Sequence, residues 1–165
     1  MRLARETIEK YVVSLEWNTV PAWAPPEMKS RRAGIFVSIH KDGRLRGCIG
    51  TILATRGSVA EEIIHNAVSA ATRDPRFDPI RPKELGSLEI HVDVLSAPER
   101  IESRRDLDVK KYGVIVSSGS KRGLLLPDLD GVDTVDEQVE IAMKKGGITA
   151  GERITLERFE VVRHS

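Results

Sequence analysis

Two alternating runs joined by Asp42-Gly43 constrain the fold more than any other part of this sequence. The runs read GIFVSIHK and RLRGCIGT, from Gly34 to Thr51. Apolar residues at every second position predict strands with one buried face, and Asp-Gly between two such runs is a strong hairpin signal. The segment therefore predicts two antiparallel strands joined by a tight turn.

Two registers can close this hairpin. A two-residue loop pairs Lys41 with Arg44, whereas a three-residue loop with Gly43 in the left-handed conformation pairs His40 with Arg44. We expect the three-residue loop, because it gathers the apolar side chains on one face of the pleat. The residues on that buried face would be Ile35, Val37, Ile39, Leu45, Gly47 and Ile49.

The opposite face of the same hairpin would carry Arg46 and Cys48, about 7 Å apart along the strand. Cys48 is the candidate nucleophile, because a nearby guanidinium stabilises a thiolate. Gly47 and Gly50, next to and near Cys48, have no side chains, which is typical of a place where a ligand or another backbone approaches a strand closely. The alternative is a structural cysteine, since a cysteine outside a disulfide often packs as a small hydrophobic side chain.

A cysteine nucleophile usually also needs a base within hydrogen-bonding reach. In the expected register His40 lies about 13 Å along the strand from Cys48, which is too far. His65 and His91 could approach only through tertiary packing. The sequence therefore locates a candidate thiol without identifying its base.

The loop that follows the second predicted helix holds a second group of candidates. Ser58 and Glu61 form a capping-box pattern that begins a helix, and Pro75 predicts its end near Arg73. The next residues read RDPRFDP, a loop in which prolines could hold charged groups in place for binding. The alternative is a solvated turn with weak local ion pairs. The candidate binding residues of this loop are Arg73, Asp74 and Arg76.

The remaining segments predict an α+β fold with largely antiparallel sheets and flanking helices. Trp17 and Trp23 flank or occupy a proline-bearing connection, where they could line a pocket or cover the core. Thr134 and Glu137 form another capping box. Helices are expected at 3–16, 59–73 and 135–145, and strands at 87–95, 113–117, 123–126 and 154–163.

Composition excludes several functions. A net charge of +1 gives no general attraction to nucleic acid or to a membrane surface. A single cysteine forms no internal disulfide and fits a reducing compartment, so we expect a soluble cytoplasmic protein. No metal site is expected, because Glu89, His91 and Asp93 span about 13 Å on a wet strand face.

The hairpin sequence LRGCIGT after GIFVSIHKDG resembles the AMMECR domain family, most closely its prokaryotic branch, AmmeMemoRadiSam system protein A. The resemblance continues through SAATRDPRFDPI, LEIHVDVLS, YGVIV, KRGLLLPDLDGVDTVDEQVEIAMKKGGI and ERFEVVRH. It covers nearly the whole chain. We therefore expect one AMMECR domain over residues 1–165.

This resemblance implies two unequal lobes with a cleft between them and the hexapeptide LRGCIG near that cleft. The family has no settled activity, and no cofactor is indicated. We expect a small metabolite to bind around Arg46, Gly47 and Gly50, with Cys48 as nucleophile or thiolate ligand and the loop at 73–76 opposite. The alternative is a non-enzymatic adaptor or sensor for Memo-like dioxygenase-family and radical S-adenosylmethionine proteins, which family members often accompany.

Overall fold

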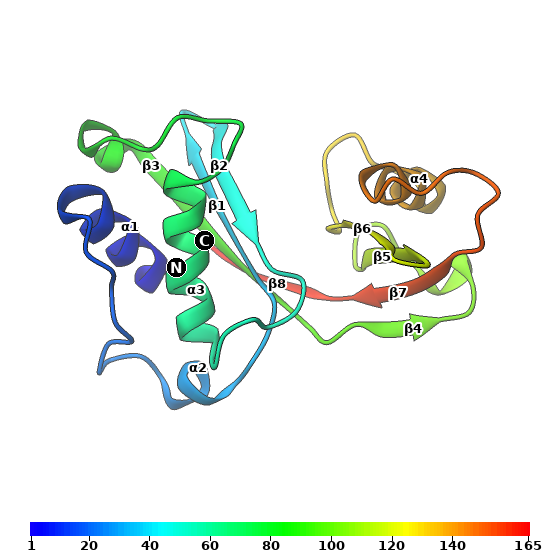
Figure 1. Ribbon diagram of the computed structural model, residues 1–165, viewed down its shortest axis with the longest axis horizontal. Coiled ribbons are helices and arrows are strands. Elements are labelled where there is room, and N and C mark those ends of the chain that lie inside the picture. The colour runs from blue at the N-terminus through cyan, green and yellow to red at the C-terminus, as the bar shows by residue number, and fades with distance from the viewer. The chain divides into compact units, whose positions relative to one another are not determined.

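A computed structural model describes residues 1–165. The chain forms two compact units, Met1–Leu95 with Val162–Ser165, and Ser96–Val161. Each unit contains a four-stranded sheet with helices, and every strand pairing between β1 and its neighbours and within the second sheet is antiparallel (Figure 1). The predicted α+β class is therefore confirmed.

The first unit has the strand order β2-β1-β3-β8. Its elements are α1 (Arg2–Ser14), α2 (Pro26–Ser30), β1 (Ile35–Lys41), β2 (Arg44–Gly50), α3 (Val59–Thr72), the 3-10 helix η1 (Pro82–Ser87), β3 (Leu88–Leu95) and β8 (Val161–His164). Helices α1 and α3 cover one face of the sheet (Figure 1), where Ile8, Ile39 and Ile63 belong to one core cluster. The predicted helices at 3–16 and 59–73 are thus present, each within two residues of its expected ends.

The predicted register of the first hairpin is wrong. Lys41 pairs with Arg44, so Asp42 and Gly43 form a two-residue turn in which φ is positive at both residues (52° and 71°). The register then shifts: Leu45 lies opposite His40, while Gly47 lies opposite Ile39. The residue between them, at position 46, is the extra residue of a β-bulge, and a uniform pleat cannot anticipate such an insertion.

This bulge changes the face of only one predicted core residue. Gly47 and Ile49 still share the helical face with Ile39 and Val37, as expected. Leu45, in contrast, lies on the other face and is 38% exposed.

The second unit has the strand order β4-β7-β5-β6. Its elements are β4 (Glu99–Ile101), the 3-10 helix η2 (Arg104–Asp106), β5 (Gly113–Ser118), β6 (Lys121–Leu125), α4 (Val135–Lys145) and β7 (Thr155–Phe159). The capping box of Thr134 and Glu137 begins α4, as predicted. Helix α4 packs so closely on β6 that a Cβ added to Gly123 would lie 1.8 Å from the Ala142 carbonyl oxygen.

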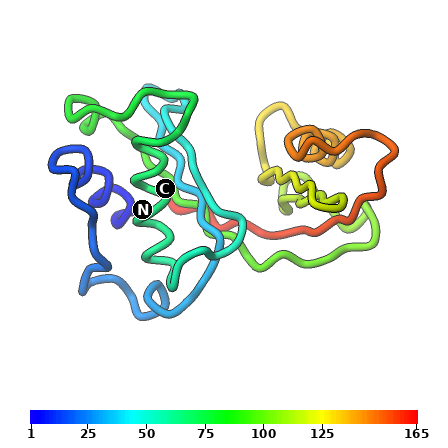
Figure 2. Tube along the Cα trace, viewed as in Figure 1, coloured from blue at the N-terminus to red at the C-terminus, as the bar shows by residue number.

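The predicted strand at 154–163 is divided between the two units. Its first part is β7 in the second sheet, and its last part is β8 in the first sheet. Figure 2 shows the chain leaving the first unit after β3, in green, and returning to it at β8, in red. No helix has the length and apolar character needed to cross a membrane.

Candidate functional site

Three strands of the first sheet place a thiol, a hydroxyl and an imidazole in one row. Cys48 on β2 lies opposite Ser38 on β1, and Ser38 lies opposite His91 on β3. Side chains directly opposite each other on one face are about 5 Å apart, so Cys48 and His91 are about 10 Å apart with Ser38 between them. This row lies on the face turned away from α3, because neighbouring Gly47 faces α3.

Two histidines meet on this face. The ring centroids of His40 and His91 are 5.3 Å apart with an interplanar angle of 72°. The Nδ1 atom of His40 is buried without a hydrogen-bond partner, and Nδ1 of His91 lies 2.9 Å from the Ser165 hydroxyl. Burial lowers the pKa of His40, and the neighbouring His91 lowers it further. His40 is therefore neutral at neutral pH.

Asp93, one of the alternating polar residues of β3, has an ionic partner of its own. Asp93 is buried and forms an ion pair with Arg163, with 2.8 Å between Nε and Oδ1. Among all 165 residues, no group of three His, Cys, Asp or Glu side chains is arranged to hold a metal ion.

The two predicted motifs contact each other through Asp74 and Arg76. The backbone N–H of Cys48 donates to Asp74 Oδ2 at 2.9 Å, and Arg76 Nη2 donates to the Cys48 carbonyl at 3.4 Å. Because β2 is the edge strand of its sheet, these two side chains satisfy the outward backbone groups that a further strand would bind. The loop thus closes the sheet edge at Cys48.

Asp74 is held as a carboxylate. It is 4% exposed and accepts hydrogen bonds from the backbone N–H, Nε and Nη2 of Arg76 at 3.1, 3.0 and 2.8 Å. The Arg76 hydrogen bonds keep the pKa of Asp74 well below its usual range despite burial, which acts in the opposite direction. Asp74 in turn raises the pKa of Arg76. The loop is therefore not a simple solvated turn.

Arg46 binds a carboxylate of its own unit. Its Nε and Nη2 donate to the two oxygens of Glu84, both at 3.1 Å, and its Nη1 donates to the Asp78 carbonyl at 2.8 Å. Glu84 also accepts from Lys41 and from the backbone of Arg81. Hydrogen bonds from Arg46 are the largest cause that lowers the pKa of Glu84 to about 2. Arg46 thus connects β2 to η1 through its bonds to Glu84. The role predicted for Arg46 in ligand binding stays a prediction.

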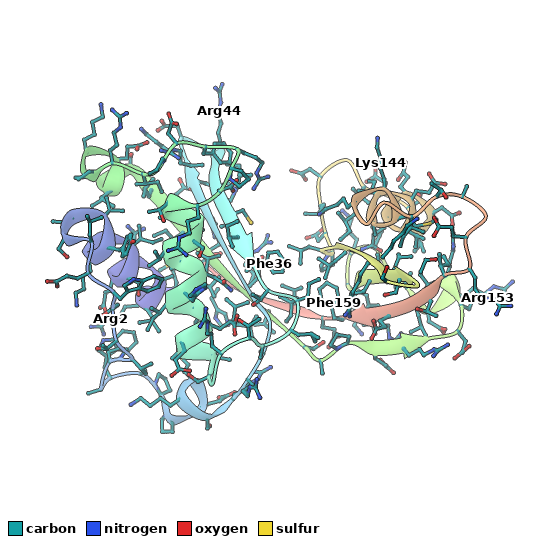
Figure 3. The ribbon with its side chains drawn as sticks, viewed as in Figure 1. Arg2, Phe36, Arg44, Lys144, Arg153 and Phe159 are labelled. Atoms are coloured by element: carbon teal, nitrogen blue, oxygen red, sulfur yellow. The ribbon has the colours of Figure 1, made fainter.

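The glycines of the hexapeptide have close neighbours within the first unit. A Cβ added to Gly47 would lie 2.3 Å from the Ala70 carbonyl oxygen of α3. One added to Gly50 would lie 2.2 Å from the ring of Phe36, which Figure 3 labels on the sheet. Of the two expected causes, a ligand or another backbone, the approach of another backbone accounts for Gly47. The neighbour of Gly50 is instead the side chain of Phe36, which the sequence analysis did not anticipate. Arg73, the last candidate, is exposed at the end of α3.

Sequence reasoning missed a buried carboxylate on α3. Glu62 is fully buried and accepts hydrogen bonds from the hydroxyls of Thr51 and Thr55 and from the backbone N–H groups of Thr55 and Arg56. Burial raises its pKa, but these bonds together lower it below its ordinary value. The signal available in the sequence was a glutamate next to the apolar residues of the predicted helix at 59–73, preceded by Thr51 and Thr55 in a loop.

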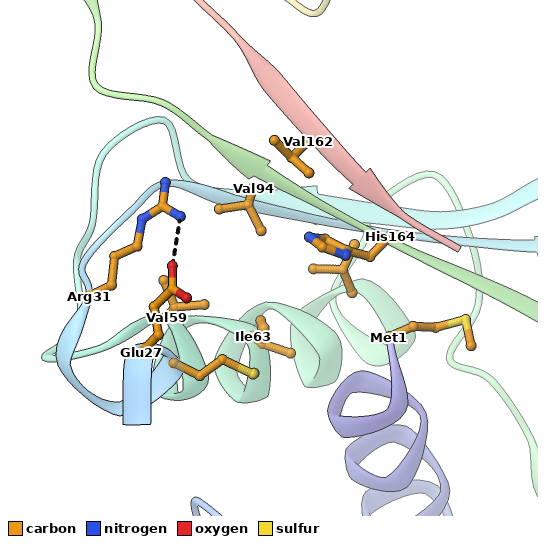
Figure 4. Close-up of a pocket in the computed structure, with 10 residues that line it drawn as sticks. Met1, Glu27, Arg31, Val59, Ile63, Val94, Val162 and His164 are labelled. Atoms are coloured by element: carbon orange, nitrogen blue, oxygen red, sulfur yellow. Dashed lines mark ion pairs between the residues drawn. The ribbon is translucent and has the colours of Figure 1, made fainter. Parts of the chain in front are cut away.

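Figure 4 shows a hollow of about 300 Å³ on the helical side of the first sheet. Apolar side chains form most of its lining, among them Val59, Ile63 and Val94, and the ion pair of Glu27 and Arg31 (3.6 Å) lies at one end. The lining contains no thiol or hydroxyl, in contrast to the opposite face of the sheet, where Cys48 lies.

Known proteins resemble this chain over nearly its full length. The AMMECR1 family model matches residues 1–164. A protein of Thermotoga maritima is 54% identical over 142 residues, which cover 85% of this chain and 82% of that protein. A protein of Clostridium acetobutylicum is 48% identical over 165 residues, but the match covers 99% of this chain and only 35% of the clostridial protein.

A solved structure has the same fold. The crystal structure of an uncharacterized protein from Pyrococcus horikoshii matches with a TM-score of 0.89 and 31% sequence identity, covering 98% of this chain and 87% of that one. The prediction drawn from the hexapeptide and the DPRF loop is therefore confirmed at the level of the family.

Proposed function

The chain belongs to the AMMECR1 family, and we propose that it is a cytoplasmic protein that binds a small metabolite around LRGCIG, with Cys48 as the reacting or ligating group. The observation that carries the proposal is the row of Cys48, Ser38 and His91 across three adjacent strands. A thiol, a hydroxyl and an imidazole on one face can bind one polar ligand and transfer its protons.

The backbone at Cys48 supports this role, because it is fixed on both sides. Asp74 accepts a hydrogen bond from the Cys48 N–H, and Arg76 donates one to the Cys48 carbonyl oxygen. These two bonds fix the position of the strand that carries the thiol. Such fixed supports keep a reacting group in place without a rearrangement on binding.

Arg76, and not Arg46, is the cation that contacts the backbone of Cys48. Both guanidinium groups are bound to a carboxylate, Arg46 to Glu84 and Arg76 to Asp74, but only Arg76 also donates to the Cys48 carbonyl. Because Asp74 accepts from the N–H of Cys48, the thiol site has a charge pair beside it and not an isolated cation.

Thiol labelling tests the proposal directly, because Cys48 is the sole cysteine of the chain. We expect iodoacetamide to label the native protein faster than the protein unfolds, with a pH midpoint that moves in His91→Gln. His65→Gln, on helix α3, is the matched control and should leave the midpoint unchanged. Labelling at the unfolding rate alone would exclude Cys48 as the reacting group.

A second function is favoured by the clostridial relative. The chain spans 35% of the length of that protein, so its sequence there is one part of a longer polypeptide. This arrangement supports the alternative of an adaptor or sensor module that works beside Memo-like and radical S-adenosylmethionine proteins. Under this alternative the Cys48 face is a docking surface.

Co-purification with those two kinds of protein separates the alternatives. Substitution of Arg46 or Arg76 would also loosen β2, so Cys48→Ser and His91→Gln are the more informative variants. An adaptor loses its partners in these variants, and Trp23→Phe on a distant loop keeps them. Association that persists in both variants would argue against docking at this face.

A further inference from the structure

A hollow of about 640 Å³ lies on the helical side of the first unit, away from the residues of the proposed thiol site. The segment after α1 supplies one wall with Trp17. The loop before α3 supplies Arg56 to the other wall, and the first turns of α3 supply Glu61, Ile64 and His65. This volume falls within the range of about 300 to 1,000 Å³ that is usual for small-molecule sites.

An aromatic platform forms one side of the hollow. The Trp17 ring stacks on the His65 ring, with centroids 5.7 Å apart and an interplanar angle of 24°, and Tyr11 meets the indole edge-on at 5.4 Å. Trp17 nevertheless remains 42% exposed. A supported and exposed indole is a surface on which a planar ring such as a nucleobase can stack.

Two charged side chains on the other wall have no partner within the protein. The guanidinium of Arg56 makes no ion pair or hydrogen bond, and the same holds for the carboxylate of Glu61. Burial lowers the pKa of His65, and Arg56 lowers it further, so the platform is neutral beside a cation at neutral pH. An unpaired guanidinium binds phosphate oxygens well, and a carboxylate can accept hydrogen bonds from ribose hydroxyls.

The wall with Arg56 is also rigid. The backbone N–H groups of Thr55 and Arg56 both donate to the buried carboxylate of Glu62 at 2.8 Å. The Arg56 carbonyl accepts a bond from Arg32 at 3.1 Å. The loop therefore presents its cation from a fixed backbone, which reduces the entropy lost on binding.

We propose that this hollow binds a nucleoside monophosphate. The base stacks on Trp17, the ribose hydroxyls donate to Glu61, and the phosphate pairs with Arg56. The site is independent of the proposed thiol chemistry, because Cys48 lies on the opposite face of the sheet.

Intrinsic fluorescence tests this site sharply, because the chain has only two tryptophans. In Trp23→Phe, where Trp17 is the remaining tryptophan, we expect AMP and GMP to change the emission in a saturable manner. In Trp17→Phe, the remaining Trp23 should not respond. The absence of a saturable change in Trp23→Phe at up to about 5 mM AMP would overturn the proposal, since that corresponds to binding weaker than about −3 kcal/mol.

Two further comparisons assign the roles of the charged groups. Arg56→Gln should weaken AMP binding at least about tenfold, and adenosine should bind the unaltered protein about tenfold more weakly than AMP does, since a charge-assisted contact is lost in both cases. Lys29→Gln, on the separate helix α2, is the matched loss of one cation and should leave the affinity unchanged. Equal affinity of Arg56→Gln and the unaltered protein would contradict the phosphate contact.

Discussion

The β1–β2 hairpin of the first unit and the β5–β6 hairpin of the second unit are built alike. In both, the second strand is the edge of its sheet and carries a glycine beneath a helix carbonyl. Gly47 lies beneath Ala70 of α3, and Gly123 lies beneath Ala142 of α4. A glycine at each position lets the helix approach the strand more closely than any other residue would.

Each sheet also pairs a glycine with an aromatic ring across two strands. Phe36 covers Gly50 in the first unit, and Phe159 covers Gly113 in the second; Figure 3 labels both rings. Because the second sheet repeats both glycine contacts without the hexapeptide, these contacts are explained by packing alone.

The two hairpins differ at their outer edges. The edge of β2 is closed by the buried Asp74 together with Arg76, whereas β6 carries the exposed Lys121 and Arg122. Charged residues on an edge strand discourage pairing with another chain, and a fixed loop achieves the same result by occupying the backbone groups. The difference is at position 48, where Asp74 and Arg76 bind the backbone N–H and carbonyl. Because these contacts use backbone atoms alone, they leave the choice of a cysteine side chain in LRGCIG unexplained by packing.

The largest expected effect tests the shared construction. Gly123→Ala and Gly47→Ala should each lower the free energy of unfolding by about 3 kcal/mol or more, because the new Cβ meets a helix backbone that cannot yield. Gly119→Ala, where no atom lies within 4 Å but φ is +56°, should cost about 1 kcal/mol. Urea unfolding followed by circular dichroism measures all three. Equal losses would mean that the helices shift to accommodate the new methyl group.

The second prediction concerns the closed edge. Asp74→Ala should destabilise the protein by about 2 to 3 kcal/mol, because the N–H of Cys48 and the guanidinium of Arg76 lose a buried acceptor that they share. Asp136→Ala is the matched control in the second unit, where the carboxylate is 73% exposed and pairs with Arg104; it should cost about 0.5 kcal/mol or less. Urea midpoints that are lowered equally would show that burial of Asp74 has little effect.

The third prediction concerns pH. The pKa of Glu84 is lowered to about 2, so the unfolded chain binds this proton more readily than the folded chain does. The stabilisation is therefore complete above about pH 4.5 and is lost as the pH falls toward 2. Glu84→Gln should cost about 1 to 2 kcal/mol at pH 7 and much less at pH 2.5. Glu89→Gln, an exposed change on β3, serves as the control, and parallel pH curves for Glu84→Gln and the unaltered protein would refute the assignment.

The smallest expected effect lies on the edge of β6. Lys121→Gln removes an exposed ion pair with Glu152 and should change the free energy of unfolding by about 0.5 kcal/mol or less. Any consequence should instead be seen as increased self-association, measured by light scattering. A loss as large as that of Asp74→Ala would remove the distinction between the two edges.

Local signals predicted most of the elements. Ser58 and Thr134 accept hydrogen bonds from the backbone N–H groups of Glu61 and Glu137 and begin their helices, as predicted. Only Glu137 completes a capping box, because its carboxylate accepts from the backbone of Thr134 and that of Glu61 does not return to Ser58. The α+β class follows from the elements that these caps delimit. The bulge at position 46 could not be predicted, because one inserted residue leaves no mark on an alternating pattern. A regular alternation therefore predicts Leu45 on the buried face of the sheet, whereas the bulge places it on the exposed face.

Long-range contacts account for the other differences. Glu62 looks like a surface residue in the sequence, and only the folded loop at 51–56 supplies its four hydrogen-bond donors. Arg46 finds Glu84 thirty-eight positions away, a partner that no local spacing reveals. For the same reason the row from Cys48 to His91 becomes visible only when the strand order is known.

The second unit is inserted between β3 and β8, two adjacent strands of the first sheet. Its two ends are tied together, since Ser96 N–H donates to the Glu160 carbonyl at 2.9 Å and Glu160 N–H donates to the Ser96 hydroxyl at 2.8 Å. Once this insert has folded, the chain between β3 and β8 acts as a short closed loop instead of a long flexible one. By loop-closure statistics this saves about 2 kcal/mol of chain entropy, so folding of the insert should promote addition of the last strand to the first sheet.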